Sequence, residues 1–69
     1  MITLMAENAA YRLLRPEEVA RMLGLSKPRI YQLAESREIP SVRIGKSVRF
    51  MVDDVDHFIN SRRRVYEGQ

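Results

Sequence analysis

Apolar residues recur with helical spacing in two neighbouring segments of the chain, separated by a glycine. In the first segment, Val19, Ala20 and Leu23 fall on one side of an α-helix. Pro16 stands where the first helical turn tolerates proline. Gly24 follows directly and can take the left-handed conformation that ends helices. The pattern therefore predicts a helix that ends in a sharp turn.

The second segment has its own start and stop signals. Ser26 offers a side-chain oxygen to cap a helix, and Pro28 lies inside the first turn. Ile39 precedes Pro40, and a residue in that position is pushed out of the helical region. We therefore expect this second helix to end near residues 37–38. Its predicted apolar face comprises Ile30, Leu33 and Ala34.

The other side of the second helix carries cations, a phenol and an amide. Lys27, Arg29, Tyr31 and Gln32 all point away from the apolar face. A short helix of this composition, placed directly after a tight turn, is typical of a recognition helix that enters a nucleic-acid groove.

Residues 42–50 alternate between apolar and polar side chains, which predicts two strands joined by a turn at Gly45-Lys46. A two-stranded ribbon is marginal alone, so we expect it to pack on the helices. Period-two alternation predicts that Arg43 and Arg49 share the outer face. The apolar residues expected on the face toward the helices are Val42, Ile44, Val48 and Phe50.

A third helix is predicted from about Val52. Asp53 and Asp54 suit its first turn, because carboxylates are favourable at the positive end of the helix dipole. The predicted buried stripe consists of Val55, Phe58 and Ile59. The run Arg62, Arg63 and Arg64 has two open explanations, helix-end electrostatics or phosphate contact. Upstream of the first helix, residues 11–14 are expected to form a short strand or lead-in, with Leu13 or Leu14 in the core.

Taken together, these elements resemble a known family of DNA-binding domains. The residues that match the helix-turn-helix pattern are Val19, Ala20, Leu23, Gly24, Leu25, Ile30 and Leu33. The segment IPSVRIGKSVRF that follows resembles the wing of small phage and integrative-element excisionases and of MerR-like regulators. The resemblance implies a mostly helical α+β fold, a winged helix-turn-helix with a two-stranded hairpin wing and a C-terminal third helix. Family members often have serine or threonine where Arg15 stands, which weakens the predicted cap of the first helix.

We expect one domain over residues 11–64, with a flexible arm at 1–10 and a tail at 65–69. The tail is expected to be disordered, and docking on a neighbouring copy is the alternative. The chain has no cysteine, which excludes disulfides and thiolate metal sites. It shows no membrane-length apolar run and no signal-peptide pattern, so we expect no membrane association and a cytoplasmic, nucleoid-associated location in a bacterial host.

Positive charge is concentrated in the middle of the chain. The net charge of the 69 residues is +3, but residues 26–50 carry six Lys or Arg against two Glu. The second helix and the predicted hairpin therefore hold all of the excess. This is the electrostatic footprint of a surface that meets phosphates, although a solvated face without a partner is the simpler alternative.

The residues expected to contact DNA fall into two groups. Backbone phosphates would be neutralised by Lys27, Arg43, Lys46 and Arg49, with neutral hydrogen bonds from Ser26, Ser41 and Ser47. Base edges would be read by Arg29 at guanine and Gln32 at adenine, while Tyr31 would contact a phosphate or a thymine methyl.

Three of these residues have competing roles. Arg49 can brace the hairpin through local hydrogen bonds, and Tyr31 can be a half-buried packing residue. Lys46, at the tip of the hairpin, can lie along the adjacent minor groove.

Catalytic chemistry has little support in the sequence. His57 is the one histidine, and Asp53 precedes it by four residues on the predicted third helix. Without a further ligand this is a poor metal site, and a solvent-facing ion pair is the favoured interpretation. We expect neither a cofactor, nor a metal, nor enzymatic activity.

The resemblance implies a specific role. Excisionases, or recombination directionality factors, bind adjacent sites on double-stranded DNA cooperatively and bend it, so that a site-specific integrase can assemble for excision. The expected partners are therefore duplex DNA, an integrase and neighbouring copies of the same chain. A small transcription regulator of the AlpA or MerR-like kind is the alternative. A DNA-packaging adaptor and a module that binds an acidic protein are less favoured.

Overall fold

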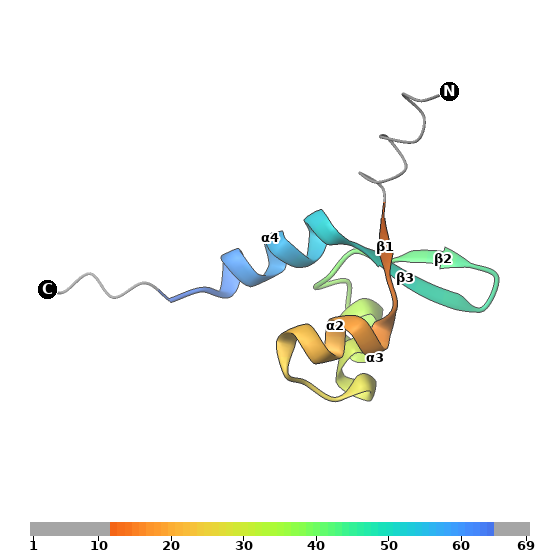
Figure 1. Cartoon of the computed structure of the whole chain (residues 1–69), viewed down its shortest axis with the longest axis horizontal. Coiled ribbons are helices and arrows are strands. Elements are labelled where there is room, and N and C mark those ends of the chain that lie inside the picture. The colour runs from red at the N-terminus through yellow and green to blue at the C-terminus, as the bar shows by residue number, and fades with distance from the viewer. Residues whose placement is uncertain (1–11, 65–69) are drawn as a thin grey trace, which may run out of the picture.

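The computed structural model describes residues 12–64, which form a helix-turn-helix lobe, a small antiparallel sheet and a further helix (Figure 1). The winged helix-turn-helix fold predicted from the sequence is confirmed. The interpretations of residues 1–10 and 65–69 lie outside the described residues. In chain order the elements are β1 (Leu13–Leu14), α2 (Pro16–Leu23), α3 (Lys27–Glu35), β2 (Val42–Ile44), β3 (Ser47–Met51) and α4 (Val52–Arg62).

The turn between α2 and α3 forms as the sequence predicts. Gly24 ends α2 with a φ of 69°, a left-handed value that glycine adopts without steric cost. Ser26 caps α3, because its Oγ accepts a hydrogen bond of 3.2 Å from the Arg29 N–H. At the start of α2, the Arg15 side chain cannot accept such a bond. Instead the Glu18 side chain reaches back to the start of the helix, where its Oε1 accepts a hydrogen bond of 2.8 Å from the Arg15 N–H. This is the glutamate half of a capping box.

Helix α3 ends two to three residues earlier than the proline signal predicts. It stops at Glu35 because Arg37 adopts a left-handed conformation, with a φ of 64°. The Arg37 N–H donates to the Ala34 carbonyl at 3.1 Å, and the Glu38 N–H donates to the Leu33 carbonyl at 3.0 Å. These two bonds define a Schellman motif, which closes the helix before the proline is reached.

The hairpin is part of a three-stranded sheet with the order β1-β3-β2. The short upstream strand is confirmed, and its partner is the far strand of the hairpin, with Leu14 opposite Phe50. The turn at Gly45-Lys46 is also confirmed. Gly45 has a φ of 62° at the first position of this two-residue turn, where a type II′ turn requires glycine.

The faces of the hairpin differ from the prediction. A two-residue turn pairs Arg43 with Val48 and Val42 with Arg49, and directly opposed residues share a face. The two arginines therefore lie on opposite faces, and the prediction that they share the outer face is wrong. Val48 is buried toward the helices, whereas Ile44 is 59% exposed. The alternation predicted within each strand is present. The two-residue turn, however, places the apolar positions of the first strand opposite the polar positions of the second, so the two sets of apolar residues lie on different faces.

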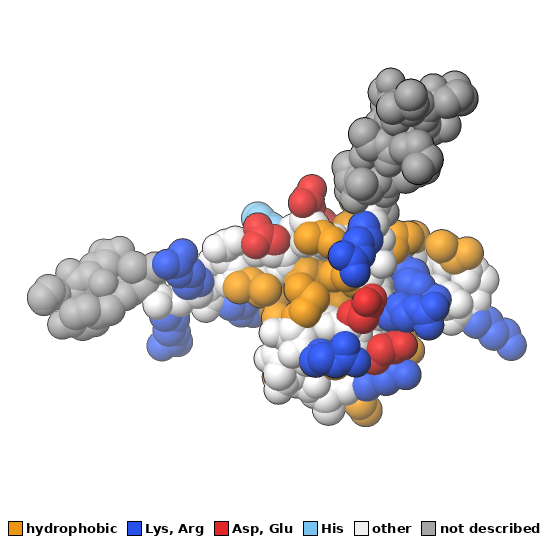
Figure 2. Space-filling model, in the orientation of Figure 1, with side chains coloured by type: hydrophobic (Ala, Val, Ile, Leu, Met, Phe, Trp, Pro, Cys, Tyr) orange, Lys and Arg blue, Asp and Glu red, His pale blue; other side chains and the backbone are white. Residues whose placement is uncertain are grey.

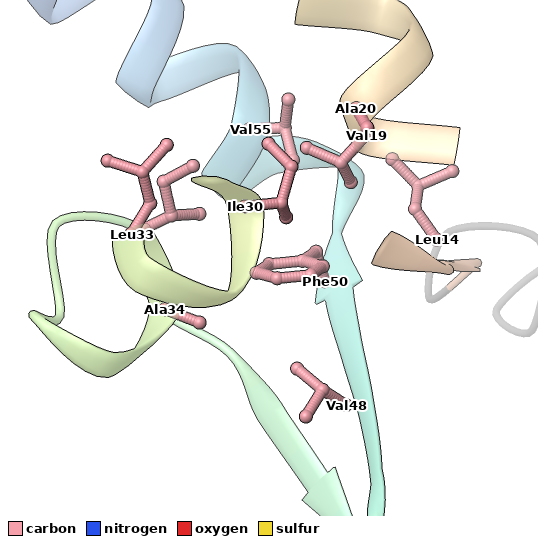
Figure 3. Packing of buried hydrophobic residues seen from close by; sticks show 10 residues of the cluster. Leu14, Val19, Ala20, Ile30, Leu33, Ala34, Val48, Phe50 and Val55 are labelled. Atoms are coloured by element: carbon pink, nitrogen blue, oxygen red, sulfur yellow. The ribbon is translucent and has the colours of Figure 1, made fainter. Parts of the chain in front are cut away.

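The core lies between α2, α3, β3 and the start of α4 (Figure 3). Phe50, Ile30 and Val55 are almost fully enclosed at its centre. Of the stripe predicted on α4, Phe58 is half-buried, but Ile59 is 40% exposed and does not belong to the core. Ile59 instead lines the edge of a groove between α4 and the helix-turn-helix lobe, together with Leu23 and Leu25.

Candidate nucleic-acid interface

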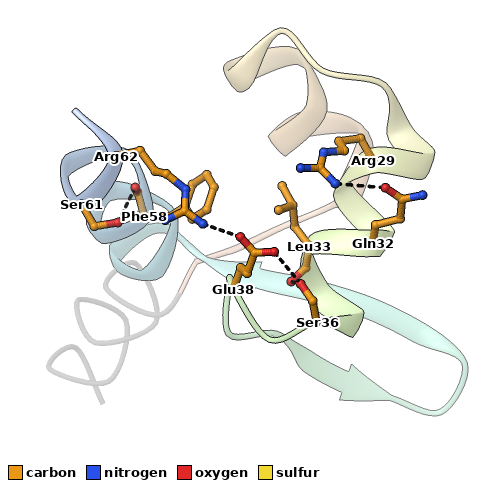
Figure 4. A network of polar contacts seen from close by, with 8 residues as sticks. All are labelled: Arg29, Gln32, Leu33, Ser36, Glu38, Phe58, Ser61 and Arg62. Carbon is orange, nitrogen blue, oxygen red and sulfur yellow. Dashed lines mark hydrogen bonds and ion pairs between the residues drawn. The ribbon is translucent and has the colours of Figure 1, made fainter. Parts of the chain in front are cut away.

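The first turns of α3 present the three predicted base-reading side chains to solvent. Arg29 and Gln32 are exposed, and Tyr31 is 42% exposed. Arg29 Nη1 donates a hydrogen bond of 3.1 Å to Gln32 Oε1 (Figure 4). A guanidinium has five N–H donors, so Arg29 retains free donors while it is held by Gln32. The structure thus brings these two side chains together on one arc of the helix.

The N-terminus of α3 combines a neutral hydroxyl with a paired cation. Ser26 is exposed, and its Oγ, which accepts the capping bond, still has its own O–H to donate. Lys27 Nζ lies 3.7 Å from Glu17 Oε1, an ion pair between the starts of the two helices. A carboxylate therefore stands directly beside one of the predicted phosphate contacts.

Glu17 lies within a group of positive charges. A hydrogen bond from its own backbone N–H is the main reason that the pKa of Glu17 is lowered; partial desolvation opposes this, and the charges of Lys27, Arg15 and Arg49 add to it. This carboxylate therefore stays ionised at neutral pH and offsets part of the local positive potential.

The hairpin contributes one arginine toward α3. Arg43 shares a face with the buried Val48, and its Nη2 lies 3.5 Å from Glu35 Oε1 on α3. Both partners are well exposed, so the pair adds little to stability. Its effect is to place the Arg43 guanidinium next to the recognition helix. Lys46 and Ser47 are exposed at the turn of the hairpin.

Arg49 has a different environment. It is half-buried on the opposite face of the hairpin from Arg43, and its Nη1 donates to the Val48 carbonyl at 2.8 Å. This bond is local, because Val48 directly precedes Arg49 on β3. Ser41, the remaining polar candidate, is half-buried between α3 and β2.

Seen from one side, basic side chains lie over several parts of the surface, including the far end of α4 (Figure 2). Lys and Arg side chains gather over the hairpin and the adjacent helical lobe, with acidic side chains between them. Apolar side chains are exposed where α4 meets the rest of the domain. Among the described residues, a shallow apolar groove of ≈ 380 Å³ is lined by Leu23, Leu25, Phe58, Ile59, Arg62 and Arg63.

The arginine run at the end of α4 contains a structural contact that the sequence did not reveal. Arg62 forms an ion pair with Glu38 in the turn after α3, and its guanidinium lies 4.7 Å from the centroid of the Phe58 ring (Figure 4). Glu38 in turn accepts a hydrogen bond of 3.0 Å from Ser36 Oγ. Arg62 thus fastens α4 to the helix-turn-helix lobe, while Arg63 and Arg64 are exposed.

The ion pair expected between Asp53 and His57 is not formed in the described part of the chain, where the ion pairs join other residues. Within residues 12–64, no three histidine or carboxylate side chains are grouped so that they could hold a metal ion. None of the helices in that range combines the length and the apolar character needed to cross a bilayer.

Sequence reasoning missed the acidic partners and one basic residue near this surface. Glu17 and Glu35 each pair with a predicted phosphate contact from another element, and such long-range pairs leave no local signal. The sequence predicted Arg37 only as part of the end of α3. Its left-handed backbone was not expected, because glycine is the residue that usually indicates this conformation.

The architecture defines the class of protein: two helices joined by a tight turn, with the second helix exposed along one side and flanked by a hairpin. Residues 13–63 match the family of helix-turn-helix domains, and the chain belongs to that family. No solved structure matches the chain.

Curated relatives come from mycobacteria. The Mycobacterium tuberculosis protein Rv0500A, whose name gives DNA binding as a provisional function, is 40% identical over 43 residues, which cover 62% of this chain and 55% of that protein. The uncharacterized Mycobacterium bovis protein Mb2337 is 35% identical over 51 residues, covering 74% of this chain and 45% of its own length. The chain spans about half the length of the curated relatives it matches.

Proposed function

We propose that this protein binds double-stranded DNA in a sequence-specific manner, with α3 in the major groove and the hairpin along the adjacent backbone or minor groove. The observation that carries the proposal is the exposed Arg29–Gln32 pair on the first turns of α3. Membership of the helix-turn-helix family and the name of the Rv0500A protein support it.

The Arg29–Gln32 pair suits base readout for a geometric reason. An arginine fork can donate to the N7 and O6 atoms of guanine, while a glutamine amide matches the N6 and N7 atoms of adenine. Because Gln32 already holds Arg29 in the free protein, less side-chain freedom is lost on binding. Tyr31, exposed on the same helix, would contact a phosphate or a thymine methyl.

Affinity would come from the cations around α3. Lys27, Arg43 and Lys46 would neutralise phosphates, with Ser26 and Ser47 adding hydrogen bonds. Arg49, which is half-buried and bonded to the neighbouring Val48 carbonyl, would be less available to phosphates than these three cations. With these three cations at phosphates, the logarithm of the binding constant should fall against the logarithm of salt with a slope of roughly −3.

For the biological role we propose an architectural protein resembling an excisionase. Copies would bind adjacent sites cooperatively and bend the duplex, so that an integrase can assemble for excision. The apolar groove beside α4, with Leu25 and Ile59 exposed along it, supports contact between neighbouring proteins, because exposed apolar surface of this kind is typical of interaction sites. Bending a site of this size costs a few kcal/mol by elastic estimates, which the added contacts would offset.

The first experiment is a titration of the purified chain with mixed-sequence duplex at low salt, followed by selection of the preferred sequence from a random pool. Binding to mixed duplex with a steep salt dependence, and recovery of a defined site, are expected. Absence of binding in the micromolar range would refute the proposal and would favour an acidic protein partner for the same basic surface.

A second experiment separates the two biological roles. A footprint on the DNA that flanks the gene should show several abutting sites occupied together, and circular-permutation gels should show a strong bend. One isolated site within a promoter, bound without bending, would instead indicate a small transcription regulator of the AlpA or MerR-like kind.

A further inference from the structure

The turn that ends α3 holds a residue in an unfavourable backbone conformation. Three described residues have a positive φ, and two of them are the glycines Gly24 and Gly45. The third is Arg37, with a φ of 64°. For a residue with a Cβ this conformation is sterically costly, and glycine is the usual occupant at this position of a Schellman motif. Costly conformations of this kind cluster at functional sites, where the side chain they position has a role.

Both neighbours of Arg37 have defined partners. Ser36 Oγ bonds to the Leu33 carbonyl at 3.3 Å and to Glu38, and Glu38 is paired with Arg62. Arg37 is exposed, and within residues 12–64 its guanidinium makes no hydrogen bond or ion pair. The turn is therefore held in place on both sides of Arg37, while the Arg37 guanidinium stabilises no other part of the described fold.

The Arg37 side chain borders a cleft between α3 and the first strand of the hairpin. This cleft has a volume of ≈ 580 Å³. Arg43 borders it as well, held toward α3 by Glu35. With Glu35 offsetting one arginine, the rim keeps a net positive charge, and the Ser41 hydroxyl adds a neutral polar group. The other lining residues are Ala34, Ile39 and Pro40.

We propose that this cleft is a binding site for a phosphate of the DNA backbone, with Arg37 as its main contact and Arg43 beside it. The inference rests on the DNA binding proposed above. A DNA strand that passes from the groove occupied by α3 to the hairpin runs over the space between these two elements, which is where the cleft lies. The C-terminal end of α3 carries partial negative charge, so a phosphate held there requires a full cation. An arginine fork matches the two free oxygens of a phosphodiester.

The left-handed backbone at Arg37 makes the test unusually sharp. Replacing Arg37 with glycine removes the guanidinium and also relieves the backbone, so that stability and DNA binding should change in opposite directions. The experiment compares the wild-type chain with R37G, R37A and R37K on one mixed-sequence duplex, across a series of salt concentrations. R21A is the matched control, because Arg21 is an exposed arginine of α2 that borders a different concavity with Arg12 and Met22.

R37G should melt a few degrees higher than the wild type, while R37A should not, because alanine keeps the strain. Both variants should bind about five- to tenfold more weakly near 0.1 M salt, with a salt slope smaller by about one unit. R37K should retain most of the slope, and R21A should bind like the wild type.

Two outcomes would overturn the inference, and they are distinguishable. If the wild type binds duplex and R37G binds equally well with the same salt slope, the phosphate site is refuted while DNA binding stands. If neither the wild type nor any variant binds duplex at low salt, the proposed function fails and the phosphate site fails with it.

Discussion

Replacing Leu33 with alanine tests whether the core under the recognition helix has the packing described above. Leu33 is 2% exposed and lies in the buried cluster with Ile30 and Phe50. Truncating a buried leucine to alanine removes its transfer free energy and leaves a cavity, at a cost of about 2–5 kcal/mol. A domain of 69 residues has a total unfolding free energy of about 3–10 kcal/mol. The substitution should therefore remove a large fraction of the stability, or all of it.

Thermal and urea unfolding, followed by circular dichroism, measure this effect. Since 1 kcal/mol shifts the melting temperature of a domain of this size by about 4–8 °C, Leu33→Ala should melt at least about 8 °C below the wild type. The matched control is Leu25→Ala, the same chemical change at a side chain that is 41% exposed in the turn between the helices. If the two variants lost similar stability, or if Leu33→Ala lost less than about 1 kcal/mol, the packing assigned to α3 would be incorrect.

Four further changes address the capping, the charges and the readout. Ser26→Ala removes the oxygen that accepts the Arg29 N–H and should cost about 0.5–2 kcal/mol in urea unfolding, whereas Ser26→Asp should not. Arg29→Ala should leave the fold intact and relax discrimination at one base by about 1–3 kcal/mol in competition binding; unchanged selectivity would contradict its role. Lys46→Ala should weaken binding to all sequences alike and reduce the salt slope by about one unit, and a loss confined to one sequence would argue for base readout instead. Glu17→Gln frees Lys27 and should tighten binding to every duplex; a weaker complex would show that the carboxylate positions Lys27 rather than opposes phosphate.

The same Glu17 variant has a pH signature in the absence of DNA. Because the pKa of Glu17 is lowered in the folded state, chiefly by the backbone hydrogen bond, its ionised form contributes stability above the ordinary value of 4.5. That contribution is lost as the pH falls through the lower folded-state pKa. Urea unfolding should therefore find the wild type more stable than Glu17→Gln at neutral pH, with the difference disappearing in acid. A difference that persisted in acid would show that it does not arise from this ionisation.

Much of the fold could be predicted because its signals are local. The helical spacing of Val19, Ala20 and Leu23, the glycine that follows and the Ser26 cap each act within a few residues, and each is found as expected. The end of α3 was placed too late because the residue that takes the left-handed conformation is Arg37. An arginine gives no signal for that conformation.

The remaining differences come from contacts between distant segments. The pairing of β1 with β3 and the ion pair between Glu38 and Arg62 join parts of the chain that local patterns treat separately. The hairpin shows the same limit on a smaller scale. Alternation was visible in each strand, but which of Arg43 and Arg49 faces α3 depends on how many residues the turn contains. The candidate base-reading side chains were predictable, whereas their acidic neighbours were not.

The pairing of β1 with β3 has a mechanical consequence for any encounter with DNA. Strand β1 pairs with β3 and leads directly into α2. The base of the hairpin is therefore joined by strand pairing to the same lobe that carries α3. The position of the hairpin relative to α3 is therefore fixed in the free protein, and so is the distance from the tip of the hairpin to the recognition helix. If that distance differs from the spacing of the grooves in straight DNA, the duplex has to bend or change its groove width to make both contacts.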